Sequence, residues 1–118
     1  VVSGGRGVGS EEGYSDYVEK LADVLGAATG STRDIVDLGW AAPETQIGQT
    51  GATVSPDLYI ALGISGAIQH ISGMQTSGTI LAVNQERDEP IFAIADIGVV
   101  ADIEDFVPEL IKALENRR

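Results

Sequence analysis

The chain has 118 residues, contains no cysteine and carries a formal net charge of −11. The length fits one compact domain, and the missing cysteine excludes disulfides and thiolate metal sites. The acidity disfavours nucleic acid and anionic membrane surfaces as partners, because both need a basic face. No apolar stretch reaches the ~20 residues of a membrane-spanning helix, and no signal peptide is visible, so we expect a cytoplasmic protein.

The acidic balance has two interpretations. Eighteen acidic residues face seven basic ones, and the only lysines are Lys20 and Lys112. An ordinary acidic surface explains this composition, and so does adaptation to high salt, where screening relieves repulsion between surface acids. The chain opens on Val1 and lacks an initiator methionine, so we expect the C-terminal part of a longer polypeptide. We also expect a prokaryotic source.

The first third of the chain predicts a strand, a glycine-rich loop and an amphipathic helix. Val1–Ser3 is typical of a strand end, and residues 4–10 form the glycine-rich loop. The helix is predicted from about Tyr14 to Ala28, because its apolar residues recur every three or four positions. Gly30 is a candidate helix stop, and a weak strand is predicted at Ile35–Leu38.

Apolar runs and turns alternate through the rest of the chain. The predicted elements, in order, are a strand at Leu58–Leu62, a short helix at Ala67–Gly73, a strand at Thr79–Val83, a charged turn at Glu86–Pro90, a strand at Ile91–Ala95, an extended piece at Val99–Ala101, and a last helix through Phe106–Leu114 with Pro108 in its first turn.

This alternation predicts a single α/β domain over residues 1–118, with a doubly wound, mostly parallel Rossmann-like sheet flanked by helices. A sheet of about five strands suits the length. Ligands of such sheets bind at the carboxyl ends of the strands. Arg6, Ser65, Asn84 and Asp96 each follow a predicted strand, so we expect them at one edge.

The segment Leu58–His70 is the most informative motif. A buried strand ends in a glycine turn at Gly63–Gly66, and a short helix follows, so unpaired backbone N–H groups should face an anion there. His70, the only histidine, lies about one helical turn further on. It is either a satisfied half-buried histidine or a donor to a cofactor carbonyl. A metal site is not favoured, because no second histidine or cysteine exists.

Three further features each have a plain and a functional interpretation. The loop 4–9 departs from the dinucleotide fingerprint G-x-G-x-x-G and could be a tight connection, but its glycines leave Arg6 free to stack on a ring or pair with an anion. Residues 46–51 form either a polar surface loop or the partner of a heterocycle edge. Asp96 and Asp102 are either caps or acids that bond ribose or adenine groups.

The motifs together resemble the alpha subunit of electron-transfer flavoproteins. The resemblance rests on Leu58–Met74 with Thr79–Asn84, on the loops Ser3–Gly7 and Gln46–Gly51, and on Asp96–Asp102 with Val107–Glu109. It covers essentially the whole chain. It implies the C-terminal FAD-binding domain of that subunit, with a fold of the kind seen in deoxyhypusine synthase.

The resemblance also implies a site for FAD. Arg6 would lie against the isoalloxazine, Thr50 near its N5 with Gln49 beside it, and His70 near its O2. Ser65 and Gly66 would lie near the pyrophosphate. The implied contacts further include Asn84, Asp102 and Ile103 at the ribose and adenine half, Thr32 and Arg33 from the other side, and Ile47, Gly48, Ala67, Ile68 and Gln69.

By the same resemblance the protein is an electron carrier rather than an enzyme, paired with a beta subunit as a heterodimer. It would take electrons from flavoprotein dehydrogenases, such as acyl-CoA dehydrogenases, and pass them to a membrane quinone oxidoreductase. The alternatives are a subunit of a flavin-based bifurcating complex that uses NADH, or a plain nucleotide-binding module. Arg6 and His70 suit an electron carrier, because reduced flavin bears negative charge near N1 and O2.

Overall fold

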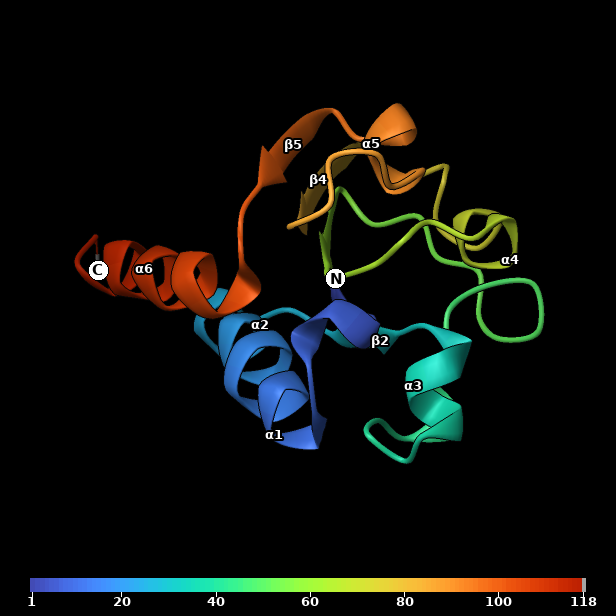
Figure 1. Ribbon diagram of the computed structural model, residues 1–118, viewed down its shortest axis with the longest axis horizontal. Helices are drawn as coiled ribbons and strands as arrows, with labels where there is room; N and C mark the ends of the chain where they lie inside the picture. The colour runs from blue at the N-terminus through green and yellow to red at the C-terminus, as the bar shows by residue number, and fades with distance from the viewer. Residues whose placement is uncertain (118) are drawn as a thin grey trace.

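The computed structural model describes residues 1–117 as an α/β fold around one five-stranded sheet (Figure 1). The strand order is β2-β1-β3-β4-β5, and every neighbouring pair runs parallel. This confirms the predicted parallel, Rossmann-like architecture. The strands are β1 (Val2–Gly4), β2 (Thr29–Ser31), β3 (Leu58–Leu62), β4 (Thr79–Asn84) and β5 (Ile97–Val100).

Helices connect the strands. The first helical segment is continuous through α1, η2 and α2, and the last helix, α6, is the longest. The helices are η1 (Arg6–Val8), α1 (Glu11–Gly13), η2 (Tyr14–Glu19), α2 (Lys20–Leu25), α3 (Arg33–Asp37), η3 (Pro43–Thr45), α4 (Ile68–Ile71), α5 (Ile91–Ile94) and α6 (Ile103–Glu115).

The first long helix is confirmed, but its ends differ from the prediction. Ser10 caps the start, because its hydroxyl accepts the Gly13 N–H at 3.0 Å. The helix ends at Gly26, which adopts the left-handed conformation (φ 66°) that favours glycine at a helix C-terminus. Gly30 as the stop was therefore wrong, since it lies in β2, a strand that the sequence reasoning missed.

Two predicted strands are helices. Ile35–Leu38 lies largely in α3, and Ile91–Ala95 largely in α5. Short, mostly apolar segments of four or five residues fit either structure by periodicity alone. The true last strand, β5, overlaps the predicted extended piece Val99–Ala101. Pro108 was also misplaced, since it lies inside α6, beyond the first turn.

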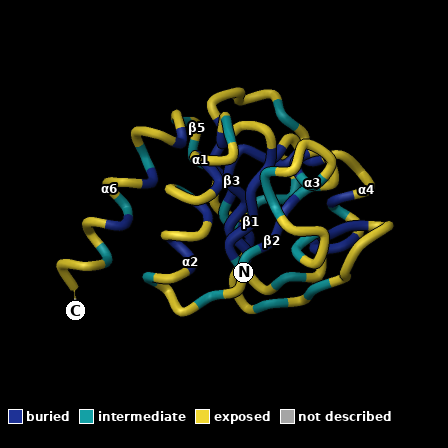
Figure 2. The backbone as a smooth tube through the Cα atoms, turned by 90° about the horizontal axis from the view of Figure 1, so that it is seen from below, coloured by how far each residue is buried: buried dark blue, intermediate teal, exposed yellow. Residues whose placement is uncertain are grey.

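Both faces of the central strands are buried, as a doubly wound fold requires, whereas the edge strand β5 is largely exposed. On one face, Ile60 and Leu62 of β3 pack with residues of η2, α2 and α6. On the other face, Tyr59 and Ala61 pack with Met74, Ile91 and the loop around Ile47. The tube in Figure 2 shows the buried strands running through the middle of the molecule. Across residues 1–117, no helix has both the length and the apolar character that crossing a membrane requires.

The strand order sets where a ligand can bind. From β1 the chain continues to β2 on one side of the sheet, and from β3 it continues to β4 on the other side. The strand order therefore reverses between β1 and β3, which makes this position the switch point of the sheet. A crevice at the carboxyl ends of such a pair is the usual binding position in open parallel sheets.

Asp96 does not lie at that edge, and this part of the prediction was wrong. Its backbone N–H donates to the Ile80 carbonyl at 2.8 Å, and its carboxylate accepts the Ile80 N–H at 2.7 Å. Asp96 precedes β5 instead of following a strand, so it ties β5 to the beginning of β4 at the amino edge. Arg6 and Ser65 do follow β1 and β3, and Asn84 ends β4.

Candidate functional site

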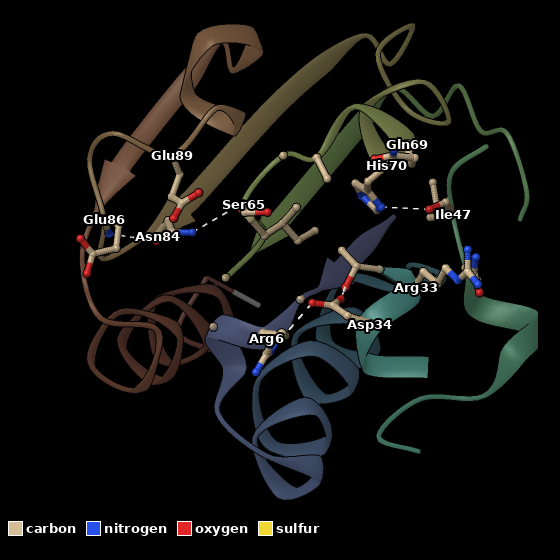
Figure 3. Close-up of a pocket in the computed structure, with 18 of the residues that line it drawn as sticks. Arg6, Arg33, Asp34, Ile47, Ser65, Gln69, His70, Asn84, Glu86 and Glu89 are labelled. Carbon is tan, nitrogen blue, oxygen red and sulfur yellow. Dashed lines mark hydrogen bonds and ion pairs between the residues drawn. The ribbon is translucent and has the colours of Figure 1, made fainter. Parts of the chain in front are cut away.

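A cavity of about 700 Å³ opens at the carboxyl edge of the sheet, between the loops that follow β1, β3 and β4 (Figure 3). All predicted site residues except Gly48 and Ile68 line it. The structure brings together around this space Arg6, Thr32, Arg33, Ile47, Gln49, Thr50, Ser65, Gly66, Ala67, Gln69, His70, Asn84, Asp102 and Ile103. Their contact with a cofactor stays a prediction.

The two glycine loops touch at the switch point of the sheet. The Gly7 N–H donates to the Gly63 carbonyl at 2.9 Å, and the Gly5 N–H donates to the Leu62 carbonyl at 3.0 Å. Gly63 has φ +65°, and a Cβ at this position would lie 2.6 Å from the Gly7 Cα. Only glycine permits this approach, because the obstructing atoms are backbone. The glycines therefore shape the floor of the cavity as well as its turns.

The loop after β3 presents a row of free donors. The backbone N–H groups of Ser65, Gly66 and Ala67 have no acceptor within residues 1–117, and all three residues line the cavity. Gly66 (φ +95°) lies so close to Ile91 that a Cβ would come within 2.4 Å of the Ile91 nitrogen. α4 spans only four residues, so the loop, more than a helix dipole, makes this an anion cradle.

His70 is buried at the far wall of the cavity, 4 % exposed, with both ring nitrogens engaged. Nδ1 lies 2.9 Å from the Ile47 carbonyl oxygen, which can only accept, so Nδ1 carries a proton. Nε2 lies 2.7 Å from the Tyr59 hydroxyl, which donates to it when the ring is neutral. Burial lowers the pKa of His70, although the Ile47 carbonyl and the charge of Asp34 oppose this shift. The site therefore holds a neutral imidazole of defined tautomer, whose single N–H is already donated to Ile47. This is the satisfied histidine of the two interpretations; the donor to a cofactor carbonyl was wrong for this arrangement.

Tyr59 is a partner of His70 that sequence reasoning missed, and its replacement gives a testable prediction. In Tyr59→Phe, Nε2 loses its donor, so we expect the His70 pKa to rise and the free energy of unfolding to fall by about 1–3 kcal/mol. Because the folded-state pKa is lowered, the wild type should lose stability as pH falls below about 6.5, and the variant should lose less over the same window.

NMR titration of the His70 ring, with denaturant unfolding at several pH values, measures both effects. Tyr17→Phe is the matched control, because Tyr17 packs on the other face of the sheet, beside α6. An unchanged His70 pKa in Tyr59→Phe would show that the hydroxyl does not hold the tautomer.

Arg6 faces an acidic side chain across the cavity mouth. Its Nε lies 4.0 Å from Asp34 Oδ2, and the side chains are 72 % and 50 % exposed, respectively. The other carboxylate oxygen, Oδ1, accepts the Thr32 hydroxyl and, at 3.1 Å, the Ile35 N–H. Asp34 was not predicted, although its position directly after Thr32 and Arg33 was a usable signal.

The loop of residues 46–51 is docked, not free. The Ile47 N–H donates to Ser31 at 3.0 Å, and the Gln49 N–H donates to the Gln69 carbonyl at 2.7 Å. Gly48 (φ +141°) permits this docking, since a Cβ there would lie 2.5 Å from the Gln69 oxygen. Gly48 thus supports the wall without lining it. The other non-lining residue, Ile68, is 76 % exposed.

The opposite end of the cavity is built by Asn84 and Asp102. Asn84 Nδ2 donates to the Ile64 carbonyl at 3.1 Å, and its Oδ1 accepts the Glu86 N–H at 2.9 Å. Asp102 caps α6, because its carboxylate accepts the Glu104 N–H at 3.1 Å. Both side chains therefore brace their own loops, and their contact with the ribose and adenine half of a cofactor stays a prediction. Glu86 and Glu89 also line this end and were missed, although the charged turn after β4 pointed to them.

A parallel sheet of order 2-1-3-4-5, with a donor-lined cavity at its switch point, defines the class of nucleotide-binding α/β domains. Within that class, residues 1–75 match the family model described as the electron transfer flavoprotein FAD-binding domain, and the chain belongs to this family.

Curated relatives carry the same name. The chain is 60 % identical over its full 118 residues to electron transfer flavoprotein subunit alpha of Mycobacterium tuberculosis, covering 37 % of that protein. It is 52 % identical over 116 residues, 98 % of the chain, to the probable mitochondrial subunit alpha of Cryptococcus neoformans, covering 34 % of it. The chain thus spans about a third of the length of these relatives.

Proposed function

We propose that this domain holds FAD and carries electrons as part of an electron transfer flavoprotein. The observation that carries the proposal is the row of free N–H groups at Ser65–Ala67, beside a cavity that also reaches Arg6 and His70. Free donors in a glycine cradle suit a pyrophosphate. FAD, when bound, supplies the redox chemistry, and the protein supplies binding, orientation and electrostatics.

Different residues of the cavity would contact different parts of FAD. In this proposal, Ser65, Gly66 and Ala67 hold the pyrophosphate. The ring system lies against Arg6, Gln49, Thr50 and His70, with Thr32, Arg33, Ile47 and Gln69 on its borders. Asn84, Asp102 and Ile103 hold the ribose and adenine half.

Several side chains are prepared for these tasks. The Gln46 amide donates to the Thr50 hydroxyl oxygen at 2.9 Å, so the Thr50 proton remains free to donate into the cavity. Arg6 brings a cation to a protein of net charge −11, whose overall field disfavours an anion. The neutral His70 adds a wall of fixed orientation but no free N–H. Arg6 and the Thr50 hydroxyl therefore favour a ligand that gains negative charge.

The wider assembly is also a proposal. We infer a cytoplasmic heterodimer with a beta subunit, which receives electrons from flavoprotein dehydrogenases, such as acyl-CoA dehydrogenases, and passes them to a membrane quinone oxidoreductase. Neither nucleic acid nor direct membrane insertion belongs to this scheme. Support comes from the names of the relatives, which are electron transfer flavoprotein alpha subunits.

The test uses the complete protein purified with its partner subunit. Addition of a dehydrogenase and its substrate should bleach the flavin absorbance, and a quinone acceptor system should restore it. Reduction by NADH alone, with two flavins per heterodimer, would favour the bifurcating alternative instead. A bound nucleotide without flavin would leave only the plain nucleotide-binding module.

We also propose that the acidic surface is an adaptation to high salt. Only Arg6–Asp34 and Arg33–Asp37 form ion pairs within residues 1–117, so most of the acidic residues lack a paired cation. Thermal unfolding should therefore shift to higher temperature as KCl rises to molar concentration. A variant with Glu12, Glu19 and Glu109 changed to glutamine should gain less. A melting temperature that stays constant or falls with KCl would contradict this proposal and favour an ordinary acidic surface.

A further inference from the structure

Asp34 is a carboxylate in the cavity wall beside Arg6, one of the residues proposed to contact the flavin ring. It lies in the first turn of α3, and Figure 3 shows its side chain beside Arg6. Oδ1 is anchored by the Thr32 hydroxyl and the Ile35 N–H, which leaves Oδ2 on the side of Arg6. The carboxylate is therefore held in one orientation.

We propose that Asp34 is a positioning residue that holds the Arg6 guanidinium at α3 in the flavin-free protein and opposes negative charge on bound flavin. This inference rests on the proposed function. A bound ring would have to share Arg6 with Asp34, or take it over. The Arg6–Asp34 pair is long and exposed, so it is weak enough to be given up.

The charge of Asp34 acts on both Arg6 and His70. Its carboxylate lies 4.0 Å from the Arg6 Nε, and its negative charge raises the pKa of His70 against the effect of burial. The neighbouring acid on the same helix, Asp37, is paired with Arg33 at 3.7 Å. Glu86 and Glu89 face the cavity from its far end. Asp34 is thus the acid whose charge opposes that of Arg6 in the part of the cavity proposed for the flavin ring.

A purely local role makes a different prediction. Acids in the first turn stabilise a helix, and Asp34 occupies that turn of α3. If this is its whole role, its removal lowers stability and leaves the flavin unaffected. The measurement must therefore read the flavin, not stability alone.

The test measures the reduction potential of the flavin in the complete heterodimer. Asp34→Asn keeps an oxygen for the Thr32 and Ile35 donors but removes the charge. We expect the preference for reduced over oxidised FAD to rise about tenfold, which is about 30 mV for a two-electron couple. Asp34→Ser, which also removes the charge, should shift the potential in the same direction if the asparagine variant folds poorly.

Asp23→Asn is the matched control, since Asp23 is an exposed acid of α2 that does not line the cavity. In the Arg6→Ala background, Asp34→Asn should shift the reduction potential less than it does in the wild type, because the shared partner is gone. Equal potentials in the Asp34 and Asp23 variants would overturn this inference alone. A wild-type heterodimer without flavin would overturn the proposed function, and this inference with it.

Discussion

Replacing Gly63 by alanine is expected to lower the free energy of unfolding by about 3–5 kcal/mol and to abolish FAD binding. The left-handed conformation accounts for about 1–2 kcal/mol. The rest comes from the new Cβ, which would lie 2.6 Å from both Gly7 Cα and its carbonyl carbon. No side chain can move aside, so the loops after β1 and β3 must separate, which breaks the Gly7–Gly63 hydrogen bond.

The chain contains a control with the same backbone conformation. Gly26 has φ 66°, and an added Cβ would meet nothing within 4 Å. Gly26→Ala should therefore show only the conformational loss and retain FAD. Urea unfolding and flavin content of both variants separate the cost of the left-handed conformation from the cost of the steric clash. Equal losses of stability in the two variants would show that the switch point can relax.

Replacing Arg6 by alanine is expected to lower the preference for reduced over oxidised FAD by tenfold or more, about 30 mV for two electrons. The cation that would stabilise the reduced ring is lost, and Asp34 is left without its opposing charge. Arg6→Lys should give an intermediate potential, because lysine keeps the charge but not the planar guanidinium. Stability should change by less than about 0.5 kcal/mol, since the side chain is 72 % exposed.

Potentiometric titration of the bound flavin measures this effect. Arg87→Ala is the control, because Arg87 is an exposed cation in the turn after β4 that does not line the cavity. If the reduction potential is the same in wild type, Arg6→Ala and Arg87→Ala, Arg6 has no influence on the flavin.

The sequence predicts the centre of the fold better than its borders. Leu58–Leu62 is a continuous apolar run, and β3 occupies the same residues. β2 was missed because its three residues, Thr29–Ser31, are small and polar and owe their strand to the pairing with β1. Asp96 was placed at the wrong edge because the apolar run before it was taken as the strand, whereas it forms α5.

The site was predictable where it depends on motifs and not where it depends on tertiary contact. The loops around Arg6, Thr50 and Ser65 all reach the cavity. The Tyr59 hydroxyl meets His70 only because alternation along β3 turns that side chain toward α4. Asp34 was missed because a strand was expected just after it, in place of the helix whose first turn orients its carboxylate.

The most direct test of the central claim is the flavin content of the complete heterodimer, read from its visible spectrum after gel filtration. We predict FAD in equimolar amount with this chain in the wild type, and its loss in Gly63→Ala but not in Gly26→Ala. A folded wild-type heterodimer that carries no flavin, and takes up none when FAD is added, would contradict the account.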